Sequence, residues 1–295
     1  MARNDESKFL LGVHTSIAGG LPRAVERAVA LGCSTFQIFP STPRGWRQKR
    51  PREEACEAFR RAVAEHGLEP FFVHLPYLPN LASPADDLYE KSGAALIQAL
   101  ETTARLGGRY VVAHLGSHRG AGAAAGGERV AAALRRAVEA TPRLGVTILL
   151  ENAAGTNAVG TTFTELASLY KMAGAKARRR LGLCLDTCHA HVSGYDLSAG
   201  GDGLERLLAE IDGGFGLARL ELVHLNDAKA AVGSGRDRHE HIGRGTIGRE
   251  GFRLIINHSQ LRPLPMILET PKVGDWDRKN LRIVKKLRKQ QNTRR

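Results

Sequence analysis

The chain has 295 residues, of which 42% are hydrophobic and 25% charged, so it can bury the core of one large α/β domain or two small ones. No stretch approaches the ~18 consecutive apolar residues of a membrane span, and the N-terminus lacks a secretory signal pattern, which excludes an integral membrane protein and predicts the cytoplasm as the compartment. The formal net charge of +13 indicates a polyanionic partner or a basic appendage.

Eight short apolar runs bounded by Gly, Pro and polar residues predict strands, and each is followed by a stretch with helical spacing. The predicted strands are 9–13, 35–39, 70–73, 110–113, 146–150, 181–185, 220–223 and 265–268. The predicted helices are 21–31, 52–66, 86–106, 128–141, 161–173, 204–211, 249–258 and 277–289. Apolar strands that alternate with helices predict a parallel sheet, and eight such units predict an α/β fold, a single-domain (β/α)8 TIM barrel.

The residue directly after each predicted strand is polar in seven of the eight cases. These positions hold His14, Pro40, His74, His114, Glu151, Asp186, His224 and Glu269. In a (β/α)8 barrel the C-terminal ends of all strands meet at one mouth, so we expect these side chains to converge there. A doubly wound open sheet is the alternative, but it would bring together only the strand ends near its switch point.

The segment 220–243 carries three side chains that can bind a metal. His224 ends an apolar run, and Asp237 and His239 lie in the polar loop behind it. His189 follows Asp186 by three residues, so both lie on one turn and His189 can face that loop. Imidazole and carboxylate are ligands that zinc and its first-row neighbours accept, and so many charges in a partly buried cavity need neutralising. His14, His118, His191 and His241 are weaker candidates.

Two loops and the C-terminal end have unusual compositions. The connector 40–51 surrounds Trp46 with basic residues, which suits phosphate contacts and insertion beside bases, although a solvated charged loop is the alternative. The patch AGAAAGGE at 121–128 predicts a flexible loop. Nine Lys/Arg and no acid lie in 278–295, which leaves 34 basic against 30 acidic residues elsewhere. We therefore place a barrel domain at 1–280 and a basic tail at 281–295, either a nonspecific nucleic-acid arm or a solubilising end.

The four cysteines fit no CxxC pairing. They are Cys33, Cys56, Cys184 and Cys188. In a reducing compartment such residues remain thiols, and we interpret them as small buried side chains.

Seven motifs spread along the chain carry a resemblance. They are HLPY at His74, HLGSH at His114, LEN at Glu151, LDTCHAHVSGYD at Asp186, HLNDAK at His224, DRHEHIGRG at Asp237 and LETP at Glu269. Together they resemble endonuclease IV, the family of metal-dependent apurinic/apyrimidinic endonucleases on a xylose-isomerase-like TIM barrel. Gly45, His191 and His241 depart from the family pattern, and the basic tail lies outside the resemblance.

The resemblance implies a site for three Zn²⁺ ions per chain, with Mn²⁺ accepted in one or more positions. It places His74 and His114 on one ion, makes Glu151 a bridge to a second ion held by Asp186, His224 and Glu269, and gives the third ion to His189, Asp237 and His239. Glu151 and Glu269 are then the catalytic carboxylates. Arg44 and Trp46 would lie in the loop that penetrates damaged DNA, and Tyr77 and Leu78 beside the extruded nucleotide.

The activity implied is cleavage of double-stranded DNA 5′ to an abasic site, with 3′-hydroxyl and 5′-deoxyribose phosphate ends, removal of 3′ blocking groups, and action as a monomer. A sugar isomerase or epimerase on the same barrel is one rival; it would use Glu151, Asp186, His224 and Glu269 but gives no role to His189, Asp237 and His239. A noncatalytic basic DNA-binding protein is the other rival. It would explain the tail but not a cavity lined with carboxylates, which repel phosphate unless they bind metal.

Overall fold

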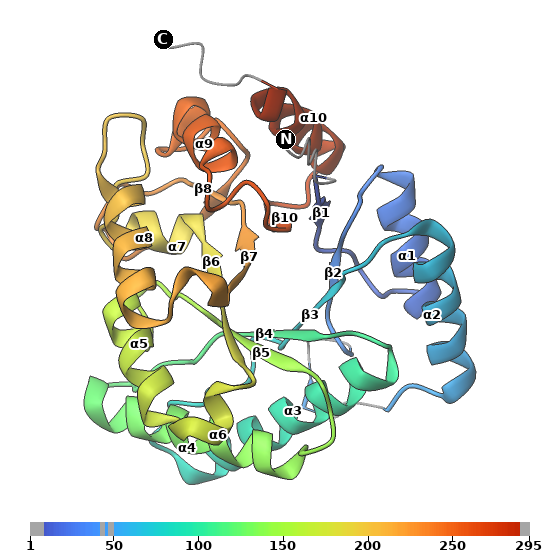
Figure 1. The fold of residues 1–295 in the computed structure, drawn as a ribbon, viewed down its shortest axis with the longest axis vertical. Helices are drawn as coiled ribbons and strands as arrows, with labels where there is room; N and C mark the ends of the chain where they lie inside the picture. The colour runs from blue at the N-terminus through green and yellow to red at the C-terminus, as the bar shows by residue number, and fades with distance from the viewer. Residues whose placement is uncertain (1–8, 42–44, 47–49, 290–295) are drawn as a thin grey trace, which may run out of the picture.

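The computed structural model describes residues 9–41, 45–46 and 50–289 and has eight parallel strands inside a ring of helices (Figure 1). The barrel strands are β1 (Leu11–Val13), β2 (Gln37–Ile38), β3 (Phe72–His74), β4 (Tyr110–Ala113), β5 (Thr147–Glu151), β6 (Leu181–Asp186), β7 (Leu220–His224) and β10 (Met266–Leu268). The predicted (β/α)8 barrel is thereby confirmed. Within the described residues, no helix is both long and apolar enough to cross a bilayer.

Helices follow the strands and surround the barrel. They are α1 (Leu21–Ala30), α2 (Glu53–His66), α3 (Asp86–Arg105), α4 (Ala123–Ala140), α5 (Phe163–Met172), α6 (Gly174–Arg178), α7 (Thr187–Val192), α8 (Gly203–Gly214), α9 (Gly248–Asn257) and α10 (Trp276–Lys289). The short helices α6 and α7 were not predicted, and neither was the small hairpin β8 (Asp227–Ala228) with β9 (His239–Glu240).

The sheet runs in the order β1-β10-β7-β6-β5-β4-β3-β2, so each strand pairs with its neighbour around the ring. The last gap, between β1 and β2, is closed by a parallel bridge of His14 with Gln37. The Thr15 amide also donates to the Gln37 carbonyl at 2.8 Å. The closure lies at the C-terminal end of β1, beside the predicted mouth.

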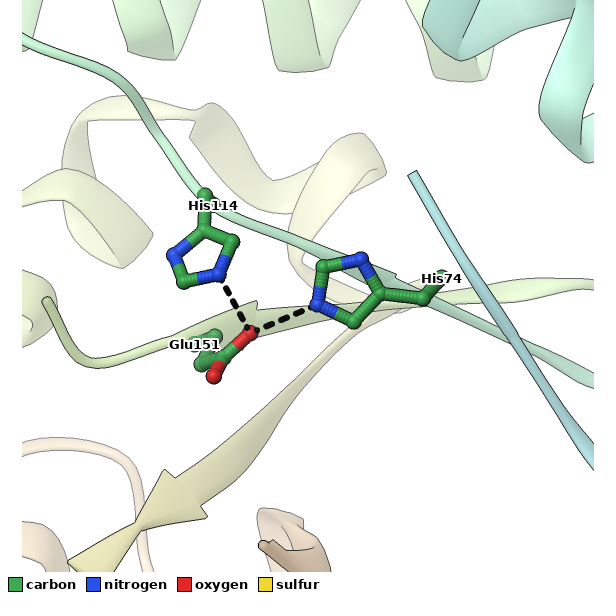
Figure 2. Close-up of side chains that lie close together, drawn as sticks. All are labelled: His74, His114 and Glu151. Atoms are coloured by element: carbon green, nitrogen blue, oxygen red, sulfur yellow. Dashed lines mark hydrogen bonds and ion pairs between the residues drawn. The ribbon is translucent and has the colours of Figure 1, made fainter. Parts of the chain in front are cut away.

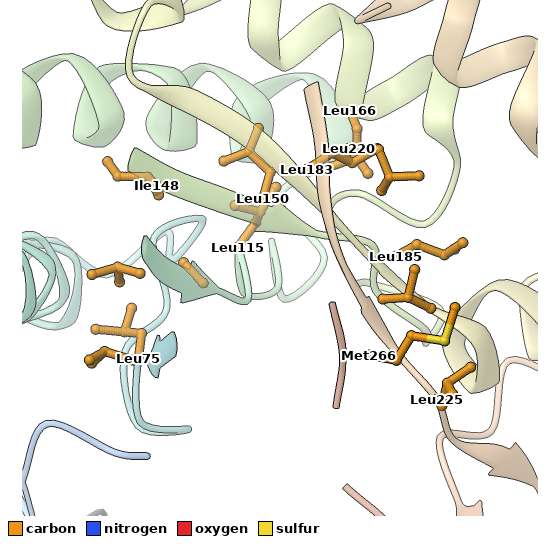
Figure 3. Close-up of a cluster of buried hydrophobic side chains, with 14 of the residues drawn as sticks. Leu75, Leu115, Ile148, Leu150, Leu166, Leu183, Leu185, Leu220, Leu225 and Met266 are labelled. Carbon is orange, nitrogen blue, oxygen red and sulfur yellow. The ribbon is translucent and has the colours of Figure 1, made fainter. Parts of the chain in front are cut away.

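Two apolar layers hold the barrel together. The outer layer lies between strands and helices and includes Ile148, Leu150, Leu183 and Leu185 (Figure 3). The inner layer fills the barrel itself with one buried side chain from each of six strands. These are Phe72, Val112, Leu149, Cys184, Leu222 and Ile267. Because neighbouring side chains on a strand point to opposite faces, residues alternate between the two layers, as Ile148, Leu149 and Leu150 do.

The predicted loop at 121–128 is wrong from its third residue onward, since α4 already begins at Ala123. Two glycines of the patch are buried in this helix. A Cβ added to Gly126 would lie 2.8 Å from the His118 Cβ, and one added to Gly127 would lie 3.1 Å from Leu169. The glycines therefore allow close helix packing rather than loop flexibility.

The C-terminal helix α10 packs beside α9 (Figure 1). Leu281, Val284 and Leu287 on its inner face are buried. The boundary placed at residue 280 thus falls inside a helix that belongs to the barrel, because every third or fourth residue beyond it is apolar. The rest of the predicted tail, 290–295, lies outside the described residues.

Candidate metal centre

The inner layer explains where the metal-binding side chains point. The residue two positions beyond each inner-layer residue must also face inward, at the C-terminal end of its strand. These residues are His74, His114, Glu151, Asp186, His224 and Glu269. Six strands thus deliver three imidazoles and three carboxylates to one place.

The first group consists of His74, His114 and Glu151 (Figure 2). Both histidines point at the same carboxylate oxygen: Nε2 of His74 lies 3.1 Å and Nε2 of His114 3.4 Å from Glu151 Oε2. The side chains of His74 and Glu151 are almost fully buried, while that of His114 is 29% exposed. This geometry agrees with the pair expected for one ion.

The second group uses the other oxygen of the same glutamate. His224 Nδ1 lies 3.1 Å from Glu151 Oε1 and 3.1 Å from Glu269 Oε2, with Asp186 Oδ2 at 4.0 Å. The four side chains offer ligand atoms within 4.8 Å of one another. Glu151 therefore faces two ligand groups with one oxygen each, as a bridging carboxylate does.

The third group lies at the edge of the mouth. Asp237, just before β9, reaches His189 Nε2 with Oδ2 at 3.3 Å and His239 Nε2 with Oδ1 at 3.3 Å. Asp237 is 50% exposed, whereas the carboxylates of the first two groups are at most 12% exposed. All three of these predicted residues are brought together.

Three of the histidines, His74, His189 and His239, point Nε2 into the site because a backbone carbonyl holds Nδ1. Nδ1 lies 2.6 Å from the Leu75 carbonyl in His74, 2.9 Å from the Asn152 carbonyl in His189 and 3.1 Å from the Glu269 carbonyl in His239. A carbonyl can only accept, so Nδ1 carries a proton, and Nε2 is the nitrogen that a cation can bind in the neutral ring. Buried Nε2 of His239 makes no hydrogen bond within the described residues, although Asp237 Oδ1 lies 3.3 Å from it. A cation would bind both atoms, and the N/O donor set suits zinc or manganese.

Gln37 is a site residue that the sequence analysis missed. It is fully buried, accepts from His224 Nε2 at 2.9 Å with its Oε1, and donates to Glu269 Oε1 at 2.6 Å with its Nε2. The predicted strand 35–39 extended too far and directed attention to Pro40, whereas β2 ends at Ile38. A polar residue inside the apolar run TFQIF was the available signal.

The two glutamates of the second group, Glu151 and Glu269, ionise easily despite their burial. Burial raises the pKa of Glu151, but the charges of His114 and His224 and hydrogen bonds from His224 and His74 outweigh it and hold the pKa well below its usual range. The pKa of Glu269 is likewise low, because His224 and His14 outweigh its burial. Both side chains are therefore acceptor-only groups near neutral pH, as metal ligation requires.

The imidazoles of the third group are strongly basic for the opposite reason. Burial lowers the pKa of His189, but Asp186, Asp237 and Glu151 together raise it to about 10. Burial also lowers the pKa of His239, and its contacts with Asp237 and Asp186 raise it to about 9. Protons and cations thus compete for the same nitrogens.

The weaker histidine candidates have other partners. His191 accepts from the Leu197 amide and contacts the Thr246 hydroxyl, His241 stacks on Trp276 at 3.9 Å, and His118 accepts from two glycine amides. His14 does approach the site, with Nδ1 3.3 Å from Glu269 Oε1. All four cysteines are free, and Cys188 shares a further candidate group with Asp186 and His239.

The described residues predicted to contact DNA are exposed, and one of them, Tyr77, lies beside the metal-binding groups. Tyr77 is 70% exposed, and its ring lies 6.3 Å from that of His114 and 6.2 Å from that of His74. Leu78 and Trp46 are also exposed. Arg44 lies outside the described residues. An exposed aromatic ring, that of Tyr77, therefore borders the metal-binding groups.

Comparisons with known proteins show the family to which the chain belongs. A family model described as a xylose isomerase-like TIM barrel matches residues 25–289. A probable endonuclease 4 of Methanoculleus marisnigri is 52% identical over 263 residues, which cover 89% of this chain and 92% of that protein. The crystal structure of endonuclease IV from Thermus thermophilus matches with a TM-score of 0.85 and 38% identity, covering 95% of this chain and 99% of that chain. A D-tagatose 3-epimerase-like protein, at 18% identity, TM-score 0.71 and coverage of 94% and 96%, shares the fold alone. The chain therefore belongs to the endonuclease IV family, whose enzymes are built on the xylose isomerase-like TIM barrel.

Proposed function

We propose that this protein is a metal-dependent DNA-repair endonuclease. It hydrolyses the phosphodiester 5′ to an abasic site in double-stranded DNA, leaves 3′-hydroxyl and 5′-deoxyribose phosphate ends, and removes blocking groups from 3′ ends. The observation that carries the proposal is the position of Glu151, whose two oxygens face two different ligand groups at the barrel mouth.

Three Zn²⁺ ions per chain fit the three groups, and Mn²⁺ has the same N/O preferences. The ligands are His74, His114, Glu151, Asp186, His189, His224, Asp237, His239 and Glu269, with Glu151 and Glu269 as the catalytic carboxylates. Bound metals of this kind activate water and neutralise the charge that develops on a phosphodiester during in-line displacement. Without that neutralisation the carboxylates would repel the substrate phosphate.

The side chains predicted to contact DNA have a role separate from metal binding. An abasic nucleotide leaves the duplex at little cost because its base is already lost. The exposed rings of Tyr77 and Trp46 and the Leu78 side chain can fill the space in the base stack, with Arg44 contributing a cation to the backbone. We propose that one chain suffices, as a monomer acting in the cytoplasm.

The third ligand group weighs against the epimerase rival. A one- or two-metal sugar isomerase needs Glu151, Asp186, His224 and Glu269 but not Asp237 with its two histidines. A noncatalytic DNA-binding protein has no use for buried carboxylates that face histidines.

Incubation with a duplex that carries one abasic analogue tests the proposal. Cleavage at the 5′ side, with a 3′ end that a polymerase extends, is expected; a chelator should abolish it, zinc or manganese should restore it, and the undamaged duplex should remain intact. An intact abasic duplex with the metal-loaded protein contradicts the proposal. Metal-dependent interconversion of ketoses by the same preparation would favour the epimerase.

A further inference from the structure

Two basic side chains beside the mouth gather around one tryptophan. Trp276, the first residue of α10, stacks on His241 with ring centroids 3.9 Å apart and an interplanar angle of 8°. The Arg244 guanidinium lies 5.1 Å and the Lys279 ammonium 4.9 Å from the centre of the same indole ring. We call Trp276, His241, Arg244 and Lys279 the indole ledge. Because His241 covers one face of the indole and cations approach the ring, it is a platform for cations rather than for a DNA base.

The indole ledge is fixed to the metal-binding segments. Asn280 on α10 is fully buried; its Nδ2 donates to Thr270 Oγ1 at 2.8 Å and to His241 Nδ1 at 3.2 Å, and its Oδ1 accepts from the Ile242 amide at 3.2 Å. Thr270 directly follows the ligand Glu269, and His241 follows the ligand His239 by two residues. The ledge therefore stands at the mouth at a defined place relative to the metal centre.

The two cations of the ledge are available to an outside partner. Both side chains are exposed, and within the described part of the chain no carboxylate lies within ion-pair distance of either. Their neighbours differ: Lys272 pairs with Asp277 at 2.7 Å, and Arg278 pairs with Asp275 at 3.3 Å. Cation–π contacts hold Arg244 and Lys279 in place without neutralising them, as phosphate contacts require.

We infer that the indole ledge binds backbone phosphates of the DNA duplex that flanks the lesion, through Arg244 and Lys279. The inference rests on the proposed function for its substrate, but the contact itself is independent of both the lesion and the base sequence. Each phosphate neutralised releases condensed counterions, so two contacts account for ~1.8 in the slope of log affinity against log salt on duplex DNA.

The test compares two double variants with equal charge changes on the metal-loaded full chain. Arg244→Gln with Lys279→Gln removes the ledge cations; Lys286→Gln with Lys289→Gln removes two exposed cations near the other end of α10. Anisotropy with undamaged duplex at several salt concentrations gives the slope, and steady-state cleavage of the abasic duplex gives KM and kcat. We expect the ledge variant to lose ~1.8 of slope and to raise KM, with kcat within about twofold of the parent, and the control variant to lose much less slope than the ledge variant.

The inference is overturned if the ledge variant has the same salt slope as the parent, or if both variants lose the same amount of slope. Circular dichroism and metal content check that the ledge variant is folded and loaded. The two proposals fail separately, because binding to undamaged duplex needs no cleavage. Suppose that the ledge variant has a reduced salt slope but the parent protein does not cleave abasic DNA. The phosphate contacts of the indole ledge would then be supported, and the proposed endonuclease activity would be refuted.

Discussion

The fold holds the two kinds of metal ligand in different ways. The strand-end ligands (His74, His114, Glu151, Asp186, His224 and Glu269) follow directly from the inner layer of the barrel, and four of them are buried to 1% or less. The loop ligands (His189, Asp237 and His239) lie beyond the strand ends, on α7 and around the β8–β9 hairpin. Asp237 and His239 are 50% and 19% exposed.

Backbone hydrogen bonds, rather than barrel packing, join the loop ligands. The Gly233 and Gly235 amides donate to the carbonyls of His191 and Val192 on α7, and the Lys229 amide donates to the Arg238 carbonyl across the hairpin. These bonds are nearer to solvent than the barrel ladder and open more readily. The fold therefore preorganises the two proposed central metal positions, while the proposed third position depends on local structure.

The largest effect is expected from Glu151→Gln, which removes the carboxylate shared by the two strand-end groups. An amide cannot serve two cations, so we expect hydrolysis to fall by more than a hundredfold, or about 2.7 kcal/mol of barrier, while DNA binding persists. Single-turnover cleavage and anisotropy measure the two properties, and circular dichroism checks the fold. Activity within about tenfold of the parent would argue against a bridging role.

Removing the loop ligands should leave the metal ions at the strand-end positions bound. For the double variant Asp237→Asn with His239→Ala, mass spectrometry of metals should find one ion per chain fewer than in the parent. The remaining ions should resist a chelator as they do in the parent, because the barrel still holds their ligands. Equal metal content in the two proteins would contradict a separate third site.

Gln37→Ala should lower the metal affinity of the strand-end positions without replacing a ligand. Loss of the hydrogen bonds to His224 and Glu269 frees both side chains, and such outer-sphere losses typically cost about 10–100-fold in metal affinity. Competition with a chromophoric chelator measures the change, with Gln260→Ala, an exposed glutamine, as the control. An unchanged affinity for all ions would mean that Gln37 only packs the barrel.

The loop ligands should also give the metal-free protein a pH signature. His189 and His239 have folded pKa values of about 10 and about 9, above the ordinary 6.5. Their contribution to stability is therefore fully present below about pH 6.5 and is lost as the pH rises through about 9 to 10. Since protons and metal compete, the rise in Tm on adding zinc should grow between about pH 6 and 9.

Thermal unfolding with and without chelator measures this signature. The Asp237→Asn, His239→Ala variant should show a flatter dependence of Tm on pH in its metal-free form. If the variant and the parent respond to pH identically, the loop ligands are not the titrating groups.

The smallest effect is expected at the C-terminal end. Truncation after Asn280 would remove the buried Leu281, Val284 and Leu287, so truncation after Lys289 is the cleaner change and removes only Arg294 and Arg295 among the charges. A DNA-anchoring tail predicts a slightly shallower salt slope with unchanged kcat. The 14 residues of α10 rise ~20 Å away from the mouth, so the loss should be smaller than in the indole ledge. An unchanged slope would identify a solubilising end.

Much of the site is determined by the order of residues alone. A strand has a fixed period of two, so Leu149 facing the barrel interior requires Glu151 to face it as well. The eight β/α units place every strand's C-terminal end at the same mouth. For these reasons the six strand-end ligands could be predicted together with the barrel. The DRH motif indicated Asp237 and His239, and the spacing after Asp186 indicated His189.

Contacts between residues far apart in the sequence could be known only from the tertiary structure. The division of the Glu151 oxygens between two groups, the contact of Gln37 with residues 187 and 232 positions away, and the attachment of α10 through Asn280 all arise from closing the ring. Local composition even suggested the wrong structure at Gly126, where only packing against His118 explains the glycine. The sequence pattern of a strand determines which face of the sheet a side chain lies on. The side chains that it contacts on that face depend on how the barrel closes and packs.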